Sequence, residues 1–282
     1  MNDRPFAPRA ALHEDTAVDS SELTCVAVYQ RPIAASVARI WENVLDWEHL
    51  PWLHRTSFAD IRLLEQSPGG WRAWVTTRTR RPREFLVEVR LDRPALRYVA
   101  RTLEGDGAGT EIWTRLEPSA ERSTRIHVRF EAPENDPARI EAIGDAYRRL
   151  YARLWDEDEA MMRRRQEVLA AAPGPKPSPG GAVPLGRLDD LRPRLPLRLR
   201  LDGRELRLVE IDGEILAHPT LCPHRGGPLD DAALDDGCIT CPWHGYRYDL
   251  RSGRCLTDQS LALEPPARVV VDGDRGEASL VW

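Results

Sequence analysis

Two short cysteine–histidine pairs in the C-terminal third of the chain carry the strongest chemical signal. Cys222 and His224 form the first pair, and 16 residues separate it from the second pair, Cys241 and His244. Two thiolates and two imidazoles can hold a [2Fe–2S] cluster, with both cysteines on one iron and both histidines on the other. Zinc accepts the same ligand types. The glycines and prolines around both pairs indicate paired loops, which favours the cluster.

A second group of metal-ligating residues lies nearer the N-terminus. Asp46, His49 and His54 follow a D-x2-H-x4-H pattern, with Pro51 between the two histidines. Histidines five positions apart do not share a face of a regular helix, but a proline between them can bend the chain so that they converge. Two histidines and a carboxylate form the facial triad of non-haem Fe(II) oxygenases. Taken alone, the pattern fits two surface histidines better than a metal site.

A third feature is a carboxylate on the apolar stripe of a long predicted helix. Periodicity predicts a helix over about 137–169. Asp158 falls on its apolar stripe, whereas Asp156, Glu157 and Glu159 lie off it and are expected to be solvated. A carboxylate on an apolar face is costly unless it is paired or binds a metal. Asp158 is therefore either the partner of an arginine or a metal ligand. The stripe consists of Ile140, Ile143, Tyr147, Leu150, Tyr151, Leu154 and Met161.

The elements that must position these residues fall into two domains. Residues 173–184 contain eight prolines and glycines in twelve positions, which predicts a linker. We expect a loose tail over 1–20, one domain over 21–172 and a second domain over 185–282. Both domains are long enough to form a hydrophobic core of their own.

The first domain is expected to alternate between strand and helix in a definite order. The residues from Leu23 to Gln30 resemble a strand, and Ser36 can cap a helix that follows. Alternating apolar residues then predict six strands before the long helix. This order predicts a curved antiparallel sheet that grips the last helix. The six strands are expected near 57–66, 71–79, 84–92, 96–103, 109–117 and 124–131.

Composition and charge exclude several classes of protein. The 282 residues are 41% hydrophobic and 30% charged, as in soluble globular proteins. No apolar stretch is long enough to span a membrane, and we see no secretory signal. The net charge of −5 argues against binding to nucleic acid or to an anionic membrane. Five cysteines are too few and odd in number for a disulfide framework, so we expect a reducing, cytoplasmic location.

The region around the C-terminal pairs closely resembles the Rieske [2Fe–2S] domain, over about 185–282. The resemblance implies that the four residues of the pairs hold the cluster, and that Trp243, Tyr246 and Tyr248 contact it. High-potential Rieske proteins carry an additional cysteine in each cluster loop, whereas Gly227 and Trp243 occupy those places here. Tyr246 stands where that group has a serine that donates to a cluster sulfur. Fewer donors lower the potential, which favours the oxygenase or ferredoxin subtype.

Next to a Rieske domain, the D-x2-H-x4-H pattern resembles the mononuclear-iron motif of Rieske non-haem iron oxygenases. Their catalytic domain has the START-like (SRPBCC) helix-grip fold, which the expected order of strands and helices also resembles. In that family an aspartate from the long helix is the third iron ligand, often as Glu-Asp with a glutamine eight residues later. Glu157, Asp158 and Gln166 match this spacing. The resemblance thus implies that His49, His54 and Asp158 bind Fe(II).

The same resemblance gives Asp46 a different role. It implies that Asp46 hydrogen-bonds His49 and bridges to a Rieske histidine, carrying the electron between the two centres. Two features depart from the family pattern. Here the Rieske domain follows the catalytic domain, and the catalytic domain is close to a bare START fold. Because the centres of the family meet across subunits of a ring-shaped trimer, a homotrimer is one expectation for this chain.

Together these features predict an α+β protein, with a START-like helix-grip domain followed by a small all-β Rieske domain. We expect it to use O₂ and external electrons to oxidise an apolar small molecule. No plausible flavin or nicotinamide site is present, so a separate reductase, with or without a ferredoxin, is implied. One alternative is a Rieske electron-transfer protein fused to a non-catalytic START-type ligand-binding domain, and another is an organising subunit with a degenerate site. The oxygenase would hold about three irons per chain and either alternative about two.

Overall fold

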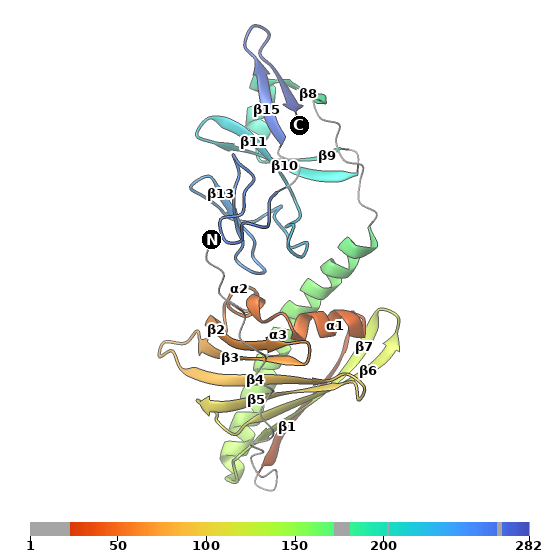
Figure 1. The fold of residues 1–282 in the computed structure, drawn as a ribbon, viewed down its shortest axis with the longest axis vertical. Coiled ribbons are helices and arrows are strands. Elements are labelled where there is room, and N and C mark those ends of the chain that lie inside the picture. The colour runs from red at the N-terminus through yellow and green to blue at the C-terminus, as the bar shows by residue number, and fades with distance from the viewer. Residues whose placement is uncertain (1–22, 172–180, 202, 264–266, 282) are drawn as a thin grey trace, which may run out of the picture.

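The computed structural model describes residues 23–171, 181–201, 203–263 and 267–281. Its two domains follow one another along the chain, a sheet with a long helix and then an all-β domain (Figure 1). The expected α+β architecture is confirmed. The tail expected over 1–20 and most of the expected linker lie outside the described residues.

The N-terminal domain is built on one antiparallel sheet of seven strands, in the order β1-β7-β6-β5-β4-β3-β2. All seven expected strands are present, with ends shifted by only a few residues. On β7, Ile126, Val128 and Phe130 are buried, whereas Arg125 and Arg129 are exposed. This alternation assigns one face of the sheet to the core. The strands are β1 (Thr24–Ile33), β2 (Phe58–Ser67), β3 (Gly70–Thr77), β4 (Glu84–Asp92), β5 (Arg97–Gly105), β6 (Glu111–Ala120) and β7 (Ser123–Ala132).

Three short helices fill the connection between β1 and β2. Helix α1 (Val37–Val44) begins at Ser36, whose side chain accepts a hydrogen bond from the backbone N–H three residues later. The 3-10 helix η2 (Trp47–His49) and helix α2 (Leu50–Leu53) follow directly. Pro51 was expected to interrupt a helix here. Instead it lies in the first turn of α2, where a missing N–H costs no hydrogen bond, and so it starts a new helix in a new direction.

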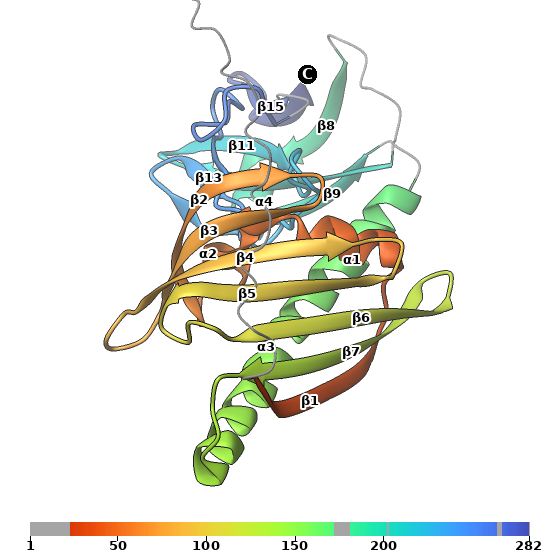
Figure 2. The ribbon, with the colours of Figure 1, turned by 60° about the horizontal axis from the view of Figure 1, so that its bottom comes forward.

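The long helix α3 (Pro137–Ala170) lies along one face of this sheet (Figures 1 and 2). Asp136 caps it by accepting a hydrogen bond from a backbone N–H of the first turn at 3.0 Å. Gly144 brings α3 close to β1, since a Cβ at this position would lie 2.3 Å from the carbonyl oxygen of Val26. In the described part of the chain no helix, α3 included, is apolar enough over a sufficient length to cross a membrane.

The C-terminal domain contains a six-stranded sheet in the order β8-β16-β15-β11-β10-β9 and a three-stranded sheet in the order β12-β13-β14. All of their pairings are antiparallel. Two short helices, α4 (Leu188–Leu191) and η3 (Arg192–Arg194), follow the first strand. The strands are β8 (Ala182–Arg187), β9 (Leu197–Leu201), β10 (Arg204–Ile211), β11 (Glu214–Pro219), β12 (Leu234–Asp235), β13 (Cys238–Thr240), β14 (Arg247–Asp249), β15 (Ala267–Asp272) and β16 (Glu277–Val281).

Strand β8 takes in the last residues of the linker expected over 173–184. Val183 packs against the core of the six-stranded sheet. Pro184 is tolerated because β8 is an edge strand, hydrogen-bonded to β16 alone. The C-terminal domain therefore begins about three residues earlier than the proline and glycine content indicated.

The C-terminal part of α3 holds the two domains together. Met161 packs into the hydrophobic core of the C-terminal domain. Further along, Arg164 lies 3.7 Å from Asp230. A Cβ on Gly226 would lie 3.1 Å from a methyl group of Val168. One rigid helix thus contacts the sheet of one domain and the cysteine–histidine loops of the other.

Candidate metal centres

The two cysteine–histidine loops of the C-terminal domain have the same backbone conformation. In the first loop the N–H of Gly226 donates to the carbonyl oxygen of Cys222 at 2.8 Å. In the second, the N–H of Gly245 donates to the carbonyl oxygen of Cys241 at 2.9 Å. Both glycines have positive φ, +76° and +70°, which glycine adopts without steric cost. The sequence therefore encodes two matching turns, each presenting one cysteine and one histidine.

The four side chains converge and fit a [2Fe–2S] cluster. The rings of His224 and His244 lie 4.6 Å apart between centroids, and both thiols are buried. Nδ1 of His224 is buried without a hydrogen-bond partner among the described residues, as expected for a ligand atom. A Cβ on Gly227 would lie 2.6 Å from Sγ of Cys241. The two thiols are close enough to share a hydrogen bond, which lowers the pKa of Cys222 and raises that of Cys241.

Three aromatic side chains expected at the cluster lie around these loops. Trp243 is buried in the same core cluster as the two cysteines. The hydroxyl of Tyr248 lies 3.2 Å from Sγ of Cys222. The ring of Tyr246 lies 4.4 Å from that of His224, but its hydroxyl donates to Oε2 of Glu48 at 3.0 Å. Tyr246 thus links the two domains, a role that its place in the motif did not reveal.

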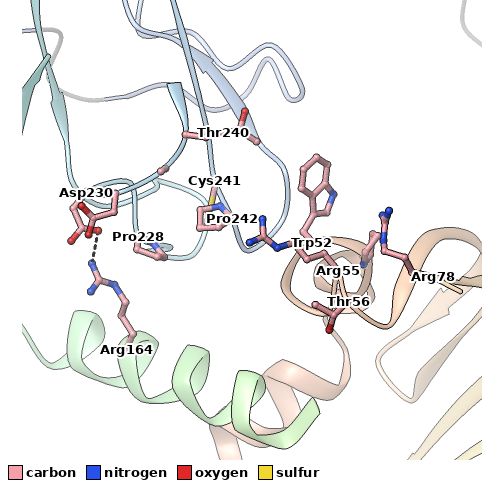
Figure 3. A pocket seen from close by; sticks show the side chains of 14 residues that line it. Trp52, Arg55, Thr56, Arg78, Arg164, Pro228, Asp230, Thr240, Cys241 and Pro242 are labelled. Carbon is pink, nitrogen blue, oxygen red and sulfur yellow. Dashed lines mark ion pairs between the residues drawn. The ribbon is translucent and has the colours of Figure 1, made fainter. Parts of the chain in front are cut away.

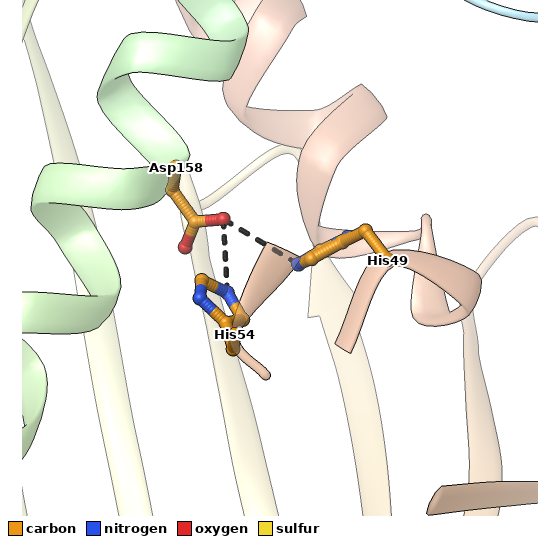
Figure 4. A group of neighbouring side chains, drawn as sticks. All are labelled: His49, His54 and Asp158. Carbon is orange, nitrogen blue, oxygen red and sulfur yellow. Dashed lines mark ion pairs between the residues drawn. The ribbon is translucent and has the colours of Figure 1, made fainter. Parts of the chain in front are cut away.

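His49, His54 and Asp158 lie together inside the N-terminal domain, the histidines at the two ends of α2 and the carboxylate on α3 (Figure 4). Oδ1 of Asp158 lies 3.4 Å from Nε2 of His49 and 3.2 Å from Nε2 of His54. One ligand atom from each residue falls within 4.8 Å of the others. The change of direction at α2 brings the histidines together, and α3 supplies the carboxylate. All three side chains are buried, and this donor set fits a divalent iron with open coordination positions.

Two residues that sequence reasoning missed hold this triad in place. Glu157 was expected to be solvated, but its Oε2 lies 2.6 Å from Nδ1 of His54. The ring of His54 thus faces both Glu157 and Asp158 on α3, one through each of its nitrogen atoms. Asn43 donates from Nδ2 to Oδ1 of Asp158 at 3.0 Å. Because Asn43 is a polar residue on the buried face of α1, the reasoning applied to Asp158 could have found it.

The other two acidic residues near Asp158 were also expected to be solvated. Asp156 and Glu159 both form ion pairs with Arg31. Glu159 is only 17% exposed, so the expectation was wrong for this residue, whereas Asp156 is 69% exposed. The pairing fixes α3 to β1 next to the triad.

Two of the three triad residues, His49 and Asp158, have the protonation state that a metal needs. Burial is the main reason that the pKa of His49 falls to about 4, so this ring is neutral near pH 7. Burial alone would raise the pKa of Asp158, but the neighbouring His54 and His49 outweigh it and keep that pKa below its usual value. The result is a carboxylate beside a neutral imidazole, which is the state that metal binding requires. Despite burial, Asp158 and Glu157 raise the pKa of His54, so a metal would displace a proton from that ring.

Asp46 lies directly between the two groups of ligands. The Nε2–H of His244 donates to its Oδ2 at 2.7 Å, which leaves Nδ1 of His244 for the cluster. The same Oδ2 lies 3.9 Å from Nδ1 of His49, so the hydrogen bond expected between these two residues is not formed, and this Nδ1 is buried without a partner among the described residues. Despite burial, chiefly the hydrogen bond from His244 lowers the pKa of Asp46 to about 2. An ionised carboxylate thus contacts both histidines within one chain, whereas the trimer expectation places this contact between subunits.

The second cysteine–histidine loop also fits tightly against the N-terminal domain. A Cβ on Gly245 would lie 2.0 Å from the ring of Trp52, so only glycine allows this approach. Arg225 lies 3.6 Å from Asp46 and 3.7 Å from Glu42. These contacts hold the loops of one domain against η2 and α2 of the other.

Two cavities adjoin these centres. A cavity of about 350 Å³ lies between α3 and the sheet, and the three triad residues line one end of it. Its walls are mostly apolar and aromatic. A larger cleft of about 1,120 Å³ opens between the domains, with Trp52, Arg55 and Arg78 on one side and Cys241 and Pro242 on the other (Figure 3). The smaller cavity is the better substrate site, because the triad opens into it and not into the cleft.

Comparison with known proteins identifies residues 181–264 as a Rieske [2Fe–2S] domain. Over 60 residues the chain is 40% identical to the ferredoxin component of the naphthalene 1,2-dioxygenase system of Pseudomonas aeruginosa, covering 21% of this chain and 58% of that protein. Over 86 residues it is 35% identical to the chloroplastic pheophorbide a oxygenase of Oryza sativa subsp. japonica, covering 29% of this chain and 16% of that protein. The chain thus spans only part of either relative.

A solved structure that resembles the chain over about half its length is remote in sequence. The Zhui aromatase/cyclase from Streptomyces sp. R1128 is 13% identical, with a TM-score of 0.45, and the match covers 53% of this chain and 99% of that structure. A likeness this remote carries no argument about activity. The match to a Rieske domain indicates electron transfer for the C-terminal domain. Any chemistry of the N-terminal domain has to be argued from its own residues.

Proposed function

We propose that this chain is a Rieske-type oxygenase that oxidises an apolar small molecule with O₂. The observation that carries the proposal is the buried Asp46 carboxylate between His244 and His49. A Rieske domain fused to a passive ligand-binding domain would have no need of an ionised carboxylate between its loop and a buried histidine. Burial of such a charge is costly, and here it serves to connect two sets of metal ligands.

Two sets of residues would hold the metals. Cys222 and Cys241 would hold one iron of the cluster, and His224 and His244 the other, while the triad would hold a separate Fe(II). When bound, the cluster supplies electrons singly, and the Fe(II) supplies open positions for O₂ and substrate.

The remaining residues bind, orient and connect. Glu157 fixes the ring of His54 and Asn43 fixes the carboxylate of Asp158, so that the ligand atoms face the cavity. Asp46 accepts the hydrogen bond from Nε2 of His244 and so holds this side of the ring towards His49. The apolar cavity holds the substrate beside the triad and limits the access of water.

The overall reaction consumes two electrons and two protons for each O₂. Either one oxygen atom enters the substrate and the other leaves as water, or both enter the substrate as two hydroxyl groups. An external reductase, with or without a ferredoxin, delivers the electrons one at a time to the Rieske domain. The substrate is an apolar small molecule that fits the 350 Å³ cavity.

The iron content of the chain tests this proposal. Wild-type protein should hold about three irons and two labile sulfides per chain. The Asp158→Ala variant should lose one iron and all product formation, while the visible spectrum of the cluster stays unchanged because the cluster lies in the other domain. Asp156→Ala is the matched control, since its carboxylate is 69% exposed and turned away from the triad.

The opposite outcomes are equally clear. Wild-type protein that holds only two irons after anaerobic Fe(II) loading, and that forms no product, would support the electron-transfer alternative. Full turnover by Asp158→Ala would show that the triad is not the site of oxidation.

A further inference from the structure

The proposed chemistry leaves several polar groups of the cavity beside the triad unused, and the hydroxyl of Tyr151 is one of them. Tyr151 lies on the cavity side of α3, with its ring edge-on to Phe130 at 4.7 Å between centroids. Tyr147, one turn earlier, stacks on the same ring at 4.8 Å. Both rings are therefore held by packing, and their hydroxyls extend from fixed positions.

Most other polar groups that line the cavity already have a neighbour to bond. Asn43 donates to Asp158, and Asp106 forms an ion pair with Arg83. The hydroxyl of Thr77 accepts a hydrogen bond from the backbone N–H of Arg83 at 3.0 Å. The Tyr147 hydroxyl lies against Thr110, and the Tyr98 hydroxyl lies near Thr114, whose Oγ1 makes no hydrogen bond among the described residues. Thr102 lies on β5 near the β5–β6 turn, where Asp106 is 48% exposed and water has access.

The hydroxyl of Tyr151 is different. No described residue hydrogen-bonds to it, and its surroundings keep the pKa of Tyr151 well above its usual value, mainly through burial. The group therefore keeps its proton and is a donor without an acceptor. A buried donor that is left without an acceptor is destabilising. A bound molecule that presents an oxygen atom at this point would supply the missing acceptor.

The size and charge of the cavity restrict that molecule further. With about 350 Å³ the cavity lies at the lower end of the range for small-molecule sites, about 300–1,000 Å³, so it suits a compact ligand such as two fused rings. No lysine or arginine is among the described residues that line it, and it contains the carboxylates of Asp106 and Asp158. It therefore disfavours anions. Seven residues of helix separate Tyr151 from Asp158, which is two turns and about 10 Å on one face.

We infer that Tyr151 determines specificity by hydrogen-bonding a ketone or hydroxyl oxygen on an uncharged two-ring substrate. The oxygen lies at the end of the molecule away from the triad, and the far ring lies beside His49, His54 and Asp158. Only the statement that this far ring is the one oxidised depends on the proposed function. The hydrogen bond and the selectivity for an oxygen-bearing ligand follow from the cavity itself.

Calorimetric titration of the full chain with two matched probes tests the inference. The probes are 1-tetralone, which carries a ketone, and tetralin, the same skeleton without it. Tyr151→Phe should weaken the binding of 1-tetralone by about three- to tenfold, the range expected for one hydrogen bond. The affinity for tetralin should change less than twofold. Tyr147→Phe is the matched control and should leave the ratio of the two affinities unchanged, because its hydroxyl already lies against Thr110.

Two results would overturn the inference. One is an affinity ratio for the probes that is the same in wild-type and Tyr151→Phe protein. The other is no binding of either probe by wild-type protein whose cluster spectrum shows it to be folded. Neither measurement involves turnover, so the inference and the oxygenase proposal can fail separately. Selective binding by a protein with only two irons would retain Tyr151 as a specificity residue and reject the oxygenase.

Discussion

Replacing Asp46 by asparagine tests the connection between the two centres most directly. The substitution keeps the size of the side chain. In the wild-type protein Nε2 of His244 lies 2.7 Å from Oδ2 of Asp46, and the amide oxygen of asparagine can still accept the Nε2–H. It removes the negative charge that faces His244, His49 and Arg225. Neither set of metal ligands is altered. Both metals should therefore remain bound, and only their communication should change.

The size of the effect follows from the loss of a charged hydrogen bond. A bond to a charged group contributes about 1.5–3 kcal/mol and a neutral one about 0.5–1.5 kcal/mol, so the Asp46→Asn bridge is weaker by about 1.5 kcal/mol. A tenfold change in an equilibrium corresponds to about 1.4 kcal/mol. Electron transfer that requires a closed bridge should therefore slow by up to about tenfold. The potential of the cluster should rise by about 60 mV, because the carboxylate favours the more positive, oxidised state.

The assay is a single turnover in a stopped-flow instrument. Protein reduced under anaerobic conditions is mixed with O₂ and substrate, and the visible bands of the cluster report its oxidation. Because Asp46 and His244 belong to one chain, the rate should not fall when the protein is diluted. Glu48→Gln is the matched control, since it replaces another carboxylate at the same interface, one bonded to Tyr246. It should leave the rate near that of the wild type.

An Asp46→Asn protein with an unchanged rate and an unchanged potential would refute the reasoning. A wild-type rate that falls on dilution would show that the functional contact forms between chains, as in the trimer expected from the family resemblance.

Two further predictions concern Glu157, which lies beside the triad, and His218, which is buried on β11. Glu157→Gln should weaken Fe(II) binding at the triad by about ten- to a hundredfold, because His54 loses the carboxylate that orients it. Titration of the protein with Fe(II) measures this change in affinity. The control is Asp156→Asn, which alters a solvent-exposed carboxylate and should leave the affinity unchanged. The pKa of the buried His218 is lowered to about 4, chiefly by burial, from 6.5 in the unfolded chain. The unfolded state binds the proton first, so this group destabilises the fold increasingly as pH falls from 6.5 towards 4, by about 2–3 kcal/mol in total. Denaturant unfolding at neutral and acid pH should show that loss in the wild type and a smaller one in His218→Phe; equal losses would contradict it.

The sequence alone determined the features that depend on neighbouring residues. The cluster ligands form pairs within two tight turns, and the turns are encoded by adjacent residues such as Gly226 and Gly245. The strands and α3 follow from the alternation of apolar residues, which reports the local conformation of the chain. Asp158 could be singled out for the same reason, since a carboxylate on an apolar stripe needs a partner wherever the helix packs.

Tertiary structure alone decided how these local features meet. Glu157 lies off the stripe and seemed solvated, yet it bonds His54 because α2 brings that ring next to α3. Asp46 and His244 are 198 residues apart, and no local pattern reports whether they touch in one chain or between two. That contact depends on how two separate domains pack. Gly245 packs against Trp52, and Met161 packs into the hydrophobic core of the C-terminal domain. Periodicity reports the burial of a face, but only the packed structure fixes what that face contacts.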